Sequence, residues 1–70
     1  MTNAVMATHK GARSKFWMVE PSDGGGLWQR FGGGEVLSFS QLEDVEPLVG
    51  LTQIDFIRSL PGGERVKPAR

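Results

Sequence analysis

The stretch Ser14–Glu20, Ser-Lys-Phe-Trp-Met-Val-Glu, decides the fold class, because it is short, aromatic and rich in β-favouring residues. It stops at Pro21–Gly26, Pro-Ser-Asp-Gly-Gly-Gly, a run typical of turns. In a strand Phe16 and Trp17 point to opposite faces, so both faces carry apolar surface. A chain of 70 residues can cover one face with helices. The other face is then left for a partner or a second copy.

Two further segments extend the predicted sheet. Leu27–Phe31 is a second aromatic run closed by the glycines 32–34, and Glu35–Phe39 can form a third strand. The two triple-glycine runs do not match Gly-x-x-x-x-Gly-Lys-Ser/Thr or Gly-x-Gly-x-x-Gly before a helix, so we interpret them as turns and not as phosphate-binding loops. The sequence predicts a two- or three-stranded antiparallel meander.

After the strands the pattern changes to a helical period. Two overlapping capping boxes, Ser38 with Gln41 and Ser40 with Glu43, predict a helix start. The apolar residues spaced for one helix face are Leu42, Val45 and Val49. Pro47 predicts a kink or restart of this helix, since proline removes a hydrogen bond and clashes with the preceding turn.

A second short helix is predicted from Thr52, whose capping partner is Asp55. Ile54, Phe56 and Arg58 also alternate, so a strand over 52–60 stays open as an alternative. The predicted fold class is therefore α+β, a small two- or three-stranded antiparallel sheet followed by two short helices. We expect a flexible basic segment at 1–13, one domain at 14–60 and a basic tail at 61–70.

The composition limits which features could stabilise so small a core. The chain has no cysteine and one histidine, His9, so we predict no disulfide, no metal site and no cofactor. Self-association as a homodimer is the remaining way to stabilise the core. The sequence has no signal-peptide pattern and no membrane-spanning run, and we expect a cytoplasmic protein.

The formal net charge is zero, but its distribution is uneven. Residues 1–15 carry +3, residues 58–70 carry +3, and residues 16–57 carry −6. Basic ends therefore flank an acidic body. The ends are interpreted either as solvated tails or as segments that grip an acidic surface.

Catalytic chemistry is missing from the sequence. No serine has a Gly-x-Ser-x-Gly setting, and His9 lies in the segment expected to be flexible. The acidic residues Glu43, Asp44 and Glu46 are explained by the first turns of the predicted helix, where the helix dipole favours negative charge. We therefore expect a protein that is not an enzyme.

The segment Leu42–Leu60, with Val49-Gly50-Leu51-Thr52-Gln53 at its centre, resembles the turn and second helix of helix-turn-helix DNA-binding proteins. The resemblance implies that Thr52, Gln53 and Arg58 would face DNA. Pro47 and the surrounding acidic residues depart from that pattern, because the acids would repel phosphates. A helix-turn-helix transcriptional regulator is the alternative function.

Aromatic residues indicate a different site. Exposed tryptophan beside arginine is typical of protein-interaction hot spots, and the candidate partner-binding residues are Trp17, Trp28, Arg30 and Phe31. In size, lack of cysteine, acidic body and glycine-punctuated strands the chain resembles small phage-encoded inhibitors of host proteins, in the style of anti-CRISPR and anti-quorum-sensing factors. The function expected first is a non-catalytic protein-binding inhibitor or adaptor.

Overall fold

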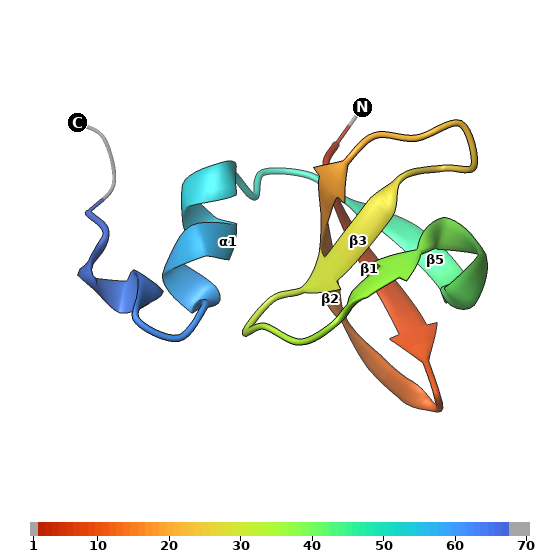
Figure 1. The fold of residues 1–70 in the computed structure, drawn as a ribbon, viewed down its shortest axis with the longest axis horizontal. Helices are drawn as coiled ribbons and strands as arrows, with labels where there is room; N and C mark the ends of the chain where they lie inside the picture. The colour runs from red at the N-terminus through yellow and green to blue at the C-terminus, as the bar shows by residue number, and fades with distance from the viewer. Residues whose placement is uncertain (1, 68–70) are drawn as a thin grey trace.

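The computed structural model describes residues 2–67, which form one five-stranded antiparallel sheet and one α-helix (Figure 1). The strands are β1 (Ala4–His9), β2 (Ala12–Glu20), β3 (Leu27–Arg30), β4 (Val36–Ser38) and β5 (Glu43–Leu48). The helix is α1 (Gln53–Ser59), and two 3-10 turns are η1 (Phe39–Gln41) and η2 (Gly63–Arg65). In the sheet the strands lie in the order β4-β3-β2-β1-β5.

The predicted fold class is wrong in both its parts. The sheet has five strands in place of two or three, and a single α-helix stands where two were expected. The predicted strands at 14–20, 27–31 and 35–39 are confirmed as β2, β3 and β4. Residues 4–9, placed by composition in a flexible segment, form β1, and residues 63–65 of the predicted tail form η2. Residues 68–70 of that tail lie outside the described residues.

The β1–β2 hairpin turns on two residues. Lys10 has a φ of 52° and Gly11 a φ of 79°, the positive pair that a tight hairpin turn with the right-handed twist requires. The two strands pair from Ala4 opposite Trp17 to His9 opposite Ala12. The hairpin places β1 beside the centre of the sheet, where β5 then pairs with its other edge.

The inner face of the sheet encloses the main core. The buried residues of this cluster are Val5, Ala7, Phe16, Trp28, Leu37 and Leu42. Strands β4 and β5 are the two edges of the sheet, and in a flat sheet they would lie about 19 Å apart. Leu37 of β4 nevertheless packs in the same cluster as Leu42 and Val45. The sheet therefore curls until its two edges share one core.

The outer face of the sheet carries a second cluster, beneath α1. Its buried members are Ala4, Trp17 and Phe56, with Phe31 and Leu48 among the partly buried residues packed against them. Figure 1 shows α1 to one side of the sheet, with η2 beyond it. The prediction that Phe16 and Trp17 face opposite sides is confirmed, and helix α1 packs on the second apolar face at Trp17.

Residues 38–49 do not form the predicted helix. The Ser38–Gln41 capping box is present, with the Ser38 N–H donating to Gln41 Oε1 over 2.9 Å, but it closes only the turn η1. The chain then continues as β5, in which Asp44 has a φ of 50° at a shift in the pairing register. Pro47 is tolerated there because β5 is an edge strand.

Helix α1 begins where the sequence predicts it. Thr52 is its N-cap, and the capping box with Asp55 is complete in both directions. Residues 53–59 are helical, so the alternative of a strand over 52–60 is not the one adopted. The helix is short and ends at Leu60, and Phe56 is its buried contact with the sheet.

Candidate functional site

The four predicted partner-binding residues do not form one surface. Trp28 is 5% exposed within the inner core, and its Nε1–H donates to the Gly25 carbonyl over 2.8 Å. Arg30 is exposed at the end of β3. Trp17 and Phe31 lie in the outer cluster, with their ring centroids 6.4 Å apart in an edge-on arrangement. Only these two of the four pack in the outer cluster.

Trp17 is the residue around which the surface is hollowed. The side chain is largely covered, since the residue is 8% exposed, yet its Nε1–H finds no acceptor within residues 2–67. No buried side-chain nitrogen or oxygen in this part of the chain lacks a hydrogen-bond partner, so the Trp17 N–H reaches the surface. Unlike Trp28, Trp17 combines a buried ring with an accessible donor.

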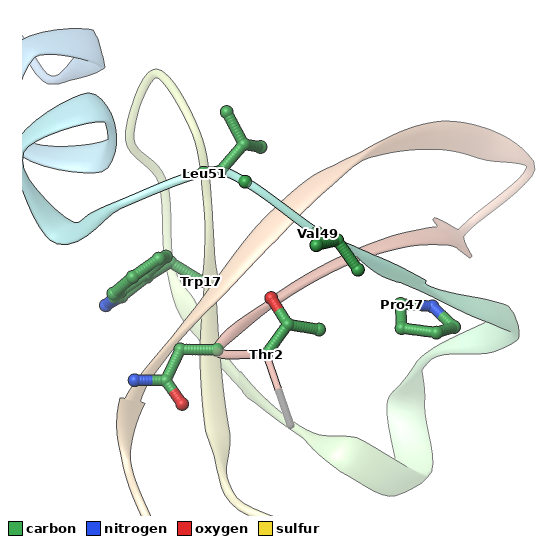
Figure 2. A pocket seen from close by; sticks show the side chains of 7 residues that line it. Thr2, Trp17, Pro47, Val49 and Leu51 are labelled. Carbon is green, nitrogen blue, oxygen red and sulfur yellow. The ribbon is translucent and has the colours of Figure 1, made fainter.

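Two cavities meet at Trp17 and Asn3, and we call them together the Trp17 groove. The first, of about 460 Å³, lies between the start of β1 and the linker from β5 to α1, and its walls include Thr2, Pro47, Val49 and Leu51 (Figure 2). The second, of about 350 Å³, opens beside α1 and includes Val19, Gln53 and Ile57. Trp17 is thus the shared wall of one groove.

The linker wall of the groove bends at Gly50. Gly50 has a φ of 99°, a conformation that glycine adopts without steric cost, and this bend carries the chain from β5 to α1. The Thr2 hydroxyl donates to the Leu48 carbonyl and joins the start of β1 to the end of β5. Val49 follows directly and is 90% exposed, although valine is normally buried.

The groove carries no formal charge on its walls. Besides the Trp17 N–H, its polar side-chain groups are the amides of Asn3 and Gln53 and the hydroxyl of Thr2. Nearby, Lys15 Nζ lies 5.2 Å from the centroid of the Phe31 ring, which places its charge over an aromatic face. The surface around Trp17 is therefore suited to uncharged apolar groups with hydrogen-bonding backbone.

Thr52, Gln53 and Arg58, the residues placed towards DNA by the helix-turn-helix resemblance, have separate surroundings. Thr52 is engaged in capping: its N–H and its hydroxyl bond Asp55 Oδ2 at 2.8 Å and 3.1 Å. These hydrogen bonds, the backbone one foremost, hold the pKa of the Asp55 carboxyl below its ordinary value. Arg58 donates to the Val66 carbonyl, and Gln53 lines the Trp17 groove. The segment that should supply the first helix of the motif is strand β5.

The single histidine, His9, lies beside the turn η1. His9 Nδ1 lies 3.2 Å from the Gln41 carbonyl oxygen at the end of β1. Among residues 2–67 there is no group of three or more histidine, cysteine or acidic side chains placed to hold a metal ion. Helix α1 has seven residues, and no helix in this part of the chain could cross a bilayer.

Sequence reasoning missed most of the groove. Thr2 and Asn3 were assigned to a flexible segment, and Val49 and Leu51 to a helix and its turn. The available signal was the pair of apolar residues flanking Gly50, immediately before the helix cap at Thr52. Their exposure could be recognised only once residues 43–48 were known to be a strand.

Comparison with protein-family models, with curated proteins and with solved structures finds no match for this chain.

Proposed function

We propose that this chain is a non-catalytic protein-binding module, an inhibitor or adaptor that covers a surface of a partner protein and docks through the Trp17 groove. The observation that carries the proposal is the junction of two uncharged cavities at a tryptophan with an accessible N–H. Tryptophan is enriched among the residues that dominate binding energy, because it offers a large apolar ring and one donor.

Val49 adds a second source of binding energy. At 90% exposure its side chain stands in water beside the groove, and covering a valine fully yields about 1.5 kcal/mol or more. Val19, 41% exposed, lies beside the second cavity and adds apolar area on the far side of Trp17. A partner that fills the groove would cover both valines together with the Trp17 edge.

The partner is proposed to be another protein. Self-association was expected from an uncovered apolar sheet face, and α1 packs on that face at Trp17. A second copy could still enter the groove, and in the cross-linking test below homodimerisation would appear as an adduct of this chain with itself. The lack of cysteine fits a reducing compartment, so we propose that the partner is met in the cytoplasm. A host protein bound by a phage-encoded inhibitor is one such partner.

Site-specific photo-cross-linking tests this function. A benzophenone amino acid is placed at Val49 in one variant and at Val36, an exposed valine of β4 outside the groove, in another. Both are irradiated in an extract of the native cells, and adducts are identified by mass spectrometry. We expect a discrete protein adduct from position 49 that is absent from position 36. Equal adduct patterns from the two positions, or adducts from 36 alone, would refute the proposed site.

A further inference from the structure

The acidic edge strand β5 runs directly into the Trp17 groove. Glu43, Asp44 and Glu46 are exposed on β5, and the same chain continues through Pro47 to Val49 at the groove wall. Building on the proposed function, we propose the chemistry of the partner segment. It is an extended peptide that inserts an uncharged apolar side chain into the groove and sets lysine or arginine side chains against β5.

The groove selects the anchor of this peptide. No charged residue lines either cavity, so a charged side chain entering there would lose its hydration without gaining an opposite charge. The accessible Nε1–H of Trp17 and the Asn3 amide can instead pair with the peptide backbone that carries the anchor. The occupant is therefore an apolar side chain on an extended backbone.

The charges beside the groove select the flank. Glu46 is paired with Arg13, whose Nη2 lies 2.6 Å from Glu46 Oε1, and this is the one ion pair among residues 2–67. Glu43 and Asp44 are left without a cationic partner there. Lys15, the other cation of the outer face of β2, lies over the Phe31 ring. The uncompensated charge at the far end of β5 is thus negative, which favours a basic segment and repels nucleic acid.

Spacing along β5 makes the proposal specific. Asp44 precedes Val49 by five positions, and an extended chain rises about 3.3 Å per residue, so roughly 16 Å separates the acidic end from the groove. A peptide lying along this strand would carry its basic residues five or six positions from the apolar anchor, opposite Asp44 and Glu43. We expect that spacing in either chain direction.

Selection from a phage-displayed library of random dodecapeptides tests the inference. The library is depleted on the Val49→Asp variant and then panned on the full-length wild-type chain and on the double variant Glu43→Gln/Asp44→Asn. Asparagine is chosen at 44 because, like aspartate, it tolerates the positive φ found there. We expect an apolar residue with lysine or arginine five or six positions away on the wild type. Peptides selected on the double variant should keep the apolar residue and lose the lysine or arginine.

The outcomes separate the two proposals. An apolar preference with no basic residues, or with acidic ones, overturns the inference about the partner and leaves the groove as a binding site. If no peptide is enriched in a way that depends on Val49, the result counts against the groove itself and hence against both proposals.

A peptide synthesised from the consensus should bind the double variant about three- to tenfold more weakly at low salt, the size expected for two exposed ion pairs. Glu64→Gln, an exposed acid outside β5, is the matched control and should leave the affinity unchanged. Equal affinity of the double variant and the wild type would contradict the basic flank.

Discussion

The indole of Trp17 stacks on the ring of Phe56, with ring centroids 6.0 Å apart and 13° between their planes. This contact fixes α1 to the outer face of the sheet, and Phe31 closes it from the side with its centroid 5.3 Å from that of Phe56. Because Trp17 and Phe56 both line the second cavity, the same stack that seats the helix shapes the groove. Stability and binding are therefore coupled at this pair.

Removing one ring of the stack should destabilise the protein strongly. Phe56→Ala is expected to lower the free energy of unfolding by about 3–5 kcal/mol, the range for truncating a buried aromatic residue. A core of this size supplies little more than that, so the cooperative transition should be largely lost in urea melts followed by circular dichroism. Val49→Ala, an exposed position, is the control. An unchanged midpoint for Phe56→Ala would show that α1 does not depend on the stack.

The Thr52–Asp55 capping box should make α1 sensitive to acid. The folded-state pKa of Asp55 is lowered by the hydrogen bonds from Thr52, so its stabilising contribution is present above the ordinary aspartate value of about 3.9. That contribution is lost as the pH falls through the lowered folded pKa. The difference in melting temperature between the wild type and Asp55→Asn should shrink from pH 6 to pH 2.5. A difference that stays constant over this interval would exclude the carboxylate as the source.

Among the glycines of residues 2–67, Gly63 leaves the least room for a side chain. A Cβ at this position would lie 1.8 Å from the Ile57 carbonyl oxygen, a backbone atom that cannot move aside without displacing α1 or η2. Gly63→Ala should cost about 1–3 kcal/mol of unfolding free energy, as other overpacked sites do. Gly24→Ala is the matched control, because nothing lies within 4 Å of its Cβ. Equal unfolding midpoints for Gly63→Ala and Gly24→Ala would mean that η2 does not pack against α1.

The strands of the central meander were predictable because local signals and the fold agree there. Ser14–Glu20 and Leu27–Phe31 are bounded by glycine turns whose positive φ angles allow few other residues. Strand β1 was missed because its basic neighbours suggested a tail. The two-residue turn at Lys10 and Gly11 was the local sign of a hairpin, although lysine is an unusual residue for its first position.

Strand β5 was mistaken for a helix for a physical reason. The bulge at Asp44 places Leu42 and Val45, three residues apart, against the same inner core. That spacing is the same as along one face of a helix. The capping box at Ser38 also matches a helix start, although it closes only one 3-10 turn. The groove could not be foreseen without β5, because Val49 is the exposed residue that directly follows the end of that strand at Leu48.

The affinity of the cross-linked partner for two valine variants tests the central claim most directly. Val49→Asp puts a charge into the uncharged groove, while Val36→Asp puts the same charge on β4, 48% exposed and outside it. By biolayer interferometry, with folding checked by circular dichroism, Val49→Asp should weaken binding at least about tenfold and Val36→Asp less than about twofold. Binding that survives Val49→Asp and is lost with Val36→Asp would contradict the account.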